Sequence, residues 1–100
     1  MTKTYSAEVF RQEGDNFRSV NLSVDADGSI RLQAQDMGKH VEEIWGDSDY
    51  EFWVHVPPAE IRKLAFALLR DKYAGRQGAV DEFRNFCKQE AIENEWGSYA

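Results

Sequence analysis

Residues 45–58, with the sequence WGDSDYEFWVHVPP, concentrate side chains that can bind a metal ion or move a proton. The carboxylates and histidines in and just before this segment are the candidate ligands: Asp36, His40, Asp47, Asp49, Glu51 and His55. A mixed carboxylate–histidine site needs several ligands that converge on one point. Alternation along a strand places only Glu51 and His55 on a common face. We therefore expect no metal site and no cofactor.

A second acidic segment, residues 23–34, has part of the spacing of a calcium loop. Asp25, Asp27 and Gly28 occupy three of the expected positions. Ser23 stands at the first position, however, and Ala34 stands where a bidentate glutamate is required. This segment is predicted to be a turn between strands and not a metal site.

Catalytic patterns are equally weak. A general base needs an orienting partner and a pocket, and neither can be read from the sequence. Cys87 lies between Phe83 and Ala91 on an apolar helical stripe, which is typical of a core residue. Residues 75–78, GRQG, lack the lysine and hydroxyl residue of a phosphate-binding loop. We therefore expect a protein that is not an enzyme.

The net charge of −6 comes almost entirely from one segment. Residues 36–51, which include Asp36, Asp47 and Asp49, carry six acids against a single lysine. Such an acidic loop is typically a solvated surface, and a negative chain disfavours nucleic acid as a partner. The sequence shows no long apolar run, no signal-peptide pattern and one cysteine. These features predict a cytoplasmic protein without membrane contact.

Alternating apolar residues predict three strands in the first third of the chain. The alternating sets are Tyr5, Ala7 and Val9; Val20, Leu22 and Val24; and Ile30, Leu32 and Ala34. A two-residue turn at residues 14–15 pairs Val9 with Val20. A three-residue turn that ends in a glycine pairs Val24 with Ile30. Because both turns pair apolar residues with apolar residues, they predict an antiparallel meander.

A fourth strand, YEFWVHV at residues 50–56, ends at two prolines, which cannot extend a sheet. Two helical stripes follow: Ile61, Leu64, Ala65, Leu68 and Leu69 in the first, and Val80, Phe83, Cys87 and Ala91 in the second. Gly75 is expected to end the first helix, and the second is expected over residues 78–93. We therefore expect one α+β domain over residues 1–100. It is a four-stranded antiparallel meander followed by two α-helices that pack on one face, in two layers.

The face of the sheet away from the helices is the candidate binding surface. Alternation places on it Glu8, Phe10, Phe17, Ser19, Asn21, Arg31, Gln33, Gln35, Glu51, Trp53 and His55. Three large aromatic residues exceed what a wetted face needs, which indicates contact with the chain's own tail, a second copy or a separate partner. The expected contact residues are Phe10, Phe17, Arg31, Trp53 and His55, with Glu51 and Asp49 adding acidic specificity.

The run LQAQDMGKHVEEIWGDSDYEFWVHV, residues 32–56, resembles the central segment of a family of small uncharacterised bacterial proteins. The resemblance is carried by Asp36 and Gly38, by WGD at residues 45–47 and by DYEF at residues 49–52. The leucine-rich helix and the AVDEFRNFCKQEAI helix fit the same layout. Some of these proteins look similar to the immunity proteins of bacterial toxin systems. The resemblance therefore implies a protein-binding role.

We thus expect a non-catalytic protein–protein interaction module, either immunity-like or homodimeric. One alternative is a binder of single-stranded nucleic acid, because bases stack on exposed aromatic side chains of a sheet. The basic residues of the helices alternate with acids, however, which is typical of ordinary helix surfaces. The other alternative is a small-molecule enzyme, which would need a concave site.

Overall fold

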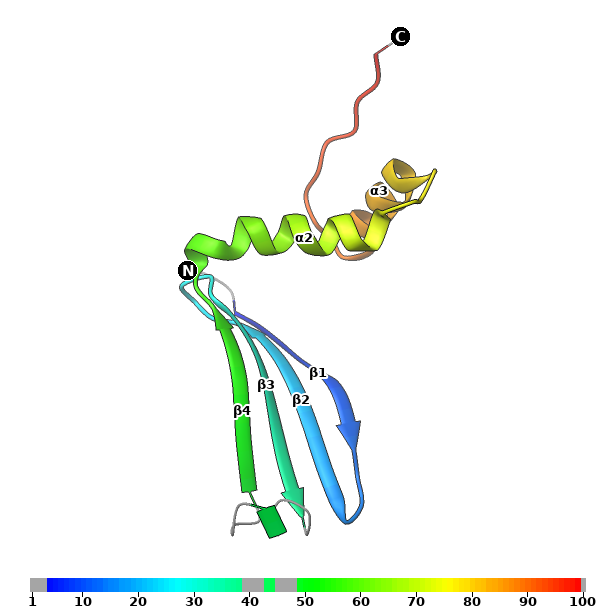
Figure 1. Ribbon diagram of the computed structural model, residues 1–100. Coiled ribbons are helices and arrows are strands. Elements are labelled where there is room, and N and C mark those ends of the chain that lie inside the picture. The colour runs from blue at the N-terminus through cyan, green and yellow to red at the C-terminus, as the bar shows by residue number, and fades with distance from the viewer. Residues whose placement is uncertain (1–3, 39–42, 45–48, 100) are drawn as a thin grey trace. The chain divides into compact units, whose positions relative to one another are not determined.

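The chain folds as a four-stranded antiparallel sheet followed by two helices, and so has the predicted α+β architecture (Figure 1). The computed structural model describes residues 4–38, 43–44 and 49–99. The strands β1 (Tyr5–Gln12), β2 (Asn16–Val24), β3 (Ile30–Gly38) and β4 (Asp49–Val56) lie in the order β1-β2-β3-β4. A 3-10 helix, η1 (Pro58–Glu60), precedes α2 (Ile61–Tyr73) and α3 (Ala79–Gln89). Contacts divide the chain after Leu64 into a sheet unit and a helical unit.

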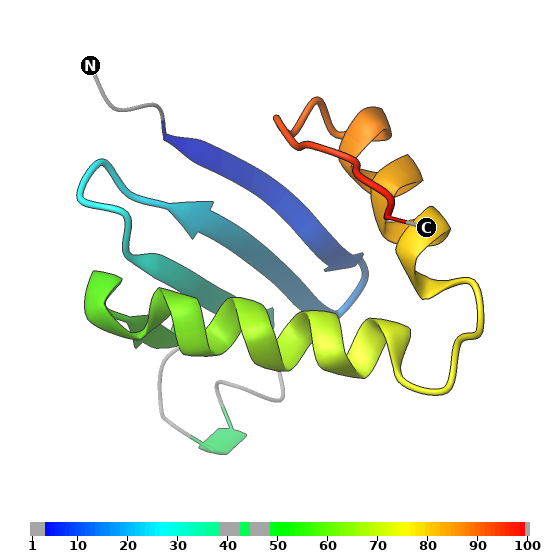
Figure 2. The same cartoon turned by 90° about the horizontal axis from the view of Figure 1, so that it is seen from above.

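The hairpin between β2 and β3 has the register that its apolar residues predict. Its cross-strand pairs include Val24–Ile30, Leu22–Leu32 and Val20–Ala34. The backbone N–H of Asp25 donates to the carbonyl oxygen of Ser29 at 2.9 Å and closes a three-residue loop. The glycine at the end of that loop, Gly28, has a φ of 90°, a conformation that L side chains adopt only with strain. Figure 2 shows β1, β2 and β3 side by side from a second direction.

β1 contains a β-bulge that the alternation of its residues does not predict. Tyr5 lies opposite Val24, as expected, but Val20 lies opposite Phe10 and not opposite Val9. The predicted position of Phe10 on the same face as Trp53 is therefore wrong, because the extra residue turns Phe10 to the other face. The predicted two-residue turn is also wrong. β1 ends at Gln12 and β2 begins at Asn16, so the loop is longer.

The two faces of the sheet differ in character. The apolar face carries Tyr5, Ala7, Phe10, Val20, Leu22, Val24, Ile30, Leu32, Ala34, Tyr50, Phe52, Val54 and Val56. The strands alone do not cover it, since the side chains of Leu32 and Val54 are 47% and 68% exposed. Removing such a surface from water is the main driving force of folding, so this face needs a cover. Packing of the helices on it stays a prediction.

The helical unit contains its own small cluster around the junction of α2 and α3. The rings of Tyr73 and Phe83 lie 5.7 Å apart, and Cys87 is only 4% exposed. Cys87 is thus a buried residue of α3, as its position on the apolar stripe predicts. Gly75 follows α2 with a φ of 74°, which suits its predicted role as the residue that ends the helix.

The second helix is shorter than predicted. α3 ends at Gln89, and Ala91 lies outside the helix with a φ of 55°. The backbone N–H of Ile92 donates to the carbonyl oxygen of Cys87 at 2.8 Å, a bond typical of a helix that ends in a left-handed residue. In the part of the chain that the structure describes, no helix is long and apolar enough to span a membrane.

Candidate binding surface

The second face of the sheet, here called the polar face, carries most of the predicted contact residues. The register places on it Glu8, Arg11, Phe17, Ser19, Asn21, Ser23, Arg31, Gln33, Gln35, Met37, Asp49, Glu51, Trp53 and His55. All the predicted contact residues except Phe10 are therefore on one surface, including the acidic residues Glu51 and Asp49. β3 and β4 contribute all of these except Phe17, which belongs to β2.

Arg31 on β3 and Trp53 on the edge strand β4 form a pair on this surface. The guanidinium carbon of Arg31 lies 5.7 Å from the centroid of the Trp53 ring, close enough for a cation–π attraction. Trp53 nevertheless remains 54% exposed. The Nε atom of Arg31 is shielded from water and has no hydrogen-bond partner in residues 4–38, 43–44 and 49–99. A shielded N–H of a cation is costly to leave unpaired.

His55 lies opposite Arg31 across the β3–β4 ladder and close to the β2–β3 loop. Two hydrogen bonds from Ser29 to Oδ1 of Asp27, from Oγ at 2.6 Å and from the backbone N–H at 2.9 Å, stabilise the ionised carboxylate. They lower the pKa of Asp27, and His55 adds a smaller effect in the same direction. The loop therefore presents a fixed negative charge beside the histidine.

The acidic residues predicted as one loop are separated by the structure. Asp49 and Glu51 belong to β4 and lie on the polar face opposite Met37 and Gln35. Asp36 belongs to β3 and lies on the apolar face, where it binds Arg18. This separation corrects the interpretation of Asp36 as part of a solvated loop, because its side chain is only 17% exposed. Asp47, like residues 45–46 of the WGD motif, lies outside the described residues.

A polar network joins β1 and β2 on the same face. The Oγ atom of Ser19 donates to Oε2 of Glu8 at 2.9 Å and accepts from Nδ2 of Asn21 at 3.1 Å. Arg11 binds Glu8 as well, and its guanidinium lies 5.0 Å from the Phe17 ring. Sequence analysis missed Arg11, since the bulge moves it to this face. Two adjacent apolar residues, Val9 and Phe10, interrupt the alternation of β1 and are the feature of the sequence that marks the bulge.

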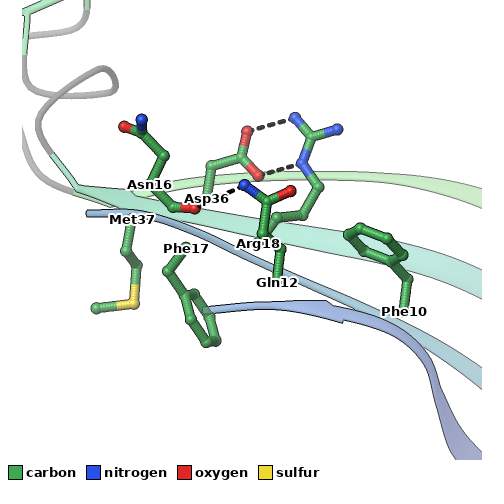
Figure 3. A pocket seen from close by; sticks show the side chains of 7 residues that line it. All are labelled: Phe10, Gln12, Asn16, Phe17, Arg18, Asp36 and Met37. Atoms are coloured by element: carbon green, nitrogen blue, oxygen red, sulfur yellow. Dashed lines mark hydrogen bonds and ion pairs between the residues drawn. The ribbon is translucent and has the colours of Figure 1, made fainter. Parts of the chain in front are cut away.

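Phe10 lines a hollow at the other end of the strands (Figure 3). This hollow has a volume of about 240 Å³ and is lined by Phe10, Gln12, Asn16, Phe17, Arg18, Asp36 and Met37. Figure 3 shows Phe10, Arg18 and Asp36 on one side of the sheet, with Phe17 and Met37 pointing to the other. Arg18 donates to both carboxylate oxygens of Asp36, at 2.5 and 2.6 Å. Among the described residues that line the hollow, the cation Arg18 is held by Asp36, and no base is oriented beside a nucleophile.

The helical unit has a second hollow, of about 370 Å³, lined by Lys72, Tyr73, Arg76, Glu82, Asn85, Phe86 and Gln89. Burial of the Tyr73 hydroxyl raises the pKa of that group. Arg76 binds Glu82 and lowers the pKa of the Glu82 carboxyl. Lys72 lies 5.0 Å from the centroid of the Phe86 ring. Each cation here already has a contact, which makes this hollow a weaker candidate than the polar face.

No protein-family model, no curated protein and no solved structure matches the chain. The resemblance to small bacterial proteins therefore stays a hypothesis. Of its motif residues, the structure places Asp36 and Gly38 in β3 and residues 49–52 in β4. Within the described residues, no group of histidine, cysteine or acidic side chains is arranged to hold a metal ion.

Proposed function

We propose that the chain is a non-catalytic protein-binding module of the cytoplasm and that it binds its partner through the polar face. The observation that supports this most is the exposed Trp53 ring beside Arg31. Tryptophan and arginine dominate the binding energy of protein interfaces, because one buries a large ring and the other forms several hydrogen bonds. Gln33 and Gln35, beside Trp53 on β3, would supply polar contacts around this anchor.

The charges around Trp53 would supply specificity. Arg31 and His55 lie toward one end of β4, and Glu51 and Asp49 lie toward the other. A partner must therefore present an acid at one end and a base at the other, with an apolar group between them. Charge patterns of this kind exclude wrong partners more than they add affinity.

Binding of single-stranded nucleic acid is the second candidate, and the two arginine–aromatic pairs of the polar face favour it. Two observations favour protein instead. Arg11 is held by Glu8 and Glu13 at 3.1 and 2.8 Å, which neutralises its charge. Glu51 lies two residues from Trp53 on the same strand face and would repel a phosphate backbone.

Capture of bound proteins with matched variants tests the proposal. The tagged chain is incubated with lysate of the source organism and with untagged copies of itself, and the bound proteins are identified by mass spectrometry. Trp53→Ser should reduce recovery of the bound protein about tenfold or more, as expected for a central tryptophan. Tyr99→Ser removes an aromatic side chain that is 102% exposed in the C-terminal segment, and it should leave recovery unchanged.

Two results would contradict the proposal. One is equal recovery by the wild type and Trp53→Ser, with both variants folded by circular dichroism. The other is binding of a fluorescent single-stranded oligonucleotide that depends on Trp53 and weakens steeply with salt, which would establish the nucleic-acid alternative.

A further inference from the structure

Arg31 and Glu51 lie on opposite sides of Trp53 along the strands. Each cross-strand pair of β3 and β4 forms a row across the sheet. The row of Arg31 and His55 lies two residues along the strands from the row of Gln33 and Trp53. The row of Gln35 and Glu51 lies two residues from it on the other side. Since a strand rises about 3.4 Å per residue, each flanking row is about 7 Å from Trp53.

Arg31 and Glu51 carry opposite charges, yet they cannot pair within one chain. They are two rows away from each other across Trp53, which corresponds to about 14 Å along the strands. Neither takes part in an ion pair among the residues that the structure describes. Each side chain thus presents an unneutralised charge on the same surface, with an exposed tryptophan between them.

We propose that the partner of this surface is a second copy of the chain, bound face to face about a two-fold axis that passes over Trp53. The inference rests on the proposed function, because it names the occupant of the same surface. If the axis lies in the interface and perpendicular to the strands, the copy runs antiparallel to the first. The copy's β4 then lies over β4, so its Glu51 is opposite His55 and one strand spacing, about 4.8 Å, from Arg31. An arginine side chain spans that offset, and the two Trp53 rings meet at the axis.

This arrangement pairs both unpaired charges of each copy, as an isologous interface requires. Every contact made by one copy is returned by the other, so a single Arg31–Glu51 pairing produces two equivalent ion pairs. Arg31 gains a carboxylate partner, and no ion pair of Arg31 occurs among the described residues. A second copy carries the same charges in the reversed order by symmetry alone, whereas a separate protein must have acquired them.

The size of the face agrees with a reversible dimer. Strands of eight or nine residues in a four-stranded sheet have a flat footprint of about 500 Å², from the usual rise and strand spacing. Stable interfaces bury about 800 Å² per partner. The rough side-chain surface brings the true area closer to that value.

Charge reversal provides the test, because self-association predicts a result that no separate partner can produce. Arg31→Glu and Glu51→Arg are each measured by sedimentation velocity over a range of concentrations on both sides of the wild-type dissociation constant. Each variant alone places like charges at both contacts, and should dimerise at least tenfold more weakly. An equimolar mixture of the two variants has complementary charges at both contacts, and should dimerise about as tightly as the wild type.

The controls change net charge by the same amount at positions outside the four strands. Arg62→Glu in α2 and Glu95→Arg in the C-terminal segment should dimerise as the wild type does. Thermal unfolding of each variant shows that it is folded.

The failures of the two proposals can be distinguished. A wild type that is monomeric throughout, while Trp53 is still needed to capture another protein, overturns the two-fold dimer and leaves the protein-binding proposal standing. A wild type that is monomeric and captures nothing in a Trp53-dependent way overturns both. A dimer that ignores both reversals lies on another surface and overturns the inference.

Discussion

The ion pair between Arg18 and Asp36 lies on the apolar face of the sheet, and a double-mutant cycle measures its contribution to stability. The guanidinium donates two parallel hydrogen bonds to the carboxylate, at 2.5 and 2.6 Å, and also lies 5.4 Å from the centroid of the Phe52 ring. The two side chains of this ion pair differ in their exposure to solvent. The Arg18 side chain is 47% exposed, and that of Asp36 is 17% exposed.

The expected coupling follows from this exposure. Two unit charges about 4 Å apart attract by about 1 kcal/mol in water and by about 4 kcal/mol near a protein surface. Solvent reaches the half-exposed guanidinium, and holding the long arginine side chain in one conformation costs entropy. The coupling free energy between Arg18→Met and Asp36→Ala should therefore be about 1 kcal/mol.

Urea unfolding of the wild type, the two single variants and the double variant gives this coupling directly. The pair of Arg11 and Glu13 is a matched control, because Glu13 is 72% exposed and its pair should couple more weakly. If the coupling between Arg18 and Asp36 is no larger than that of the control, then the lower exposure of Asp36 on the apolar face does not strengthen the ion pair.

Two further predictions concern the end of β3 and the loop between β2 and β3. Gly38→Ala should lower the free energy of unfolding by about 2 kcal/mol or more, because φ is 124° and the added Cβ atom would overlap the backbone carbonyl oxygen of Asp15. Gly28→Ala places its Cβ atom in open space and should lower it by roughly 1 kcal/mol, through backbone strain alone. Urea midpoints rank the two variants, and an equal cost would contradict the close approach at Gly38. The lowered pKa of Asp27 makes its contribution to stability present above the ordinary value of 3.8 and lost as pH falls through the lower folded value. Ser29→Ala should therefore flatten the loss of stability below about pH 4, measured by urea unfolding at several pH values, and an unchanged acid profile would contradict the role of these hydrogen bonds.

The element order and the hairpin between β2 and β3 could be predicted from the sequence because local chemistry specifies them. The glycine at position 28 suits a left-handed turn residue, and only one register of the flanking strands pairs apolar residues with apolar residues. Most of the polar face follows from that register. Arg31, Trp53, His55 and Glu51 are placed correctly, because β3 and β4 continue the same alternation.

The β-bulge could not be predicted by the same reasoning. Val9 and Phe10 are both apolar, so either residue makes an acceptable partner for Val20, and the pattern of apolar pairs does not distinguish the two registers. The consequence is large for the candidate site, because Phe10 leaves it and Arg11 joins it. The end of α3 was missed for a related reason. Ala91 fits the helical stripe, but it adopts a left-handed conformation for which glycine is the usual signal.

Oxidative footprinting of the tryptophans tests whether the polar face is the contact surface. Hydroxyl radicals modify exposed indole rings, and mass spectrometry of the peptides reports Trp53 and Trp96 separately. The two rings are 54% and 55% exposed, so they serve as test and internal reference. Oxidation of Trp53 should slow several-fold when the chain binds its partner, whether a second copy or another protein, while the rate at Trp96 stays the same. Equal oxidation of Trp53 in the free and bound chain would contradict this prediction.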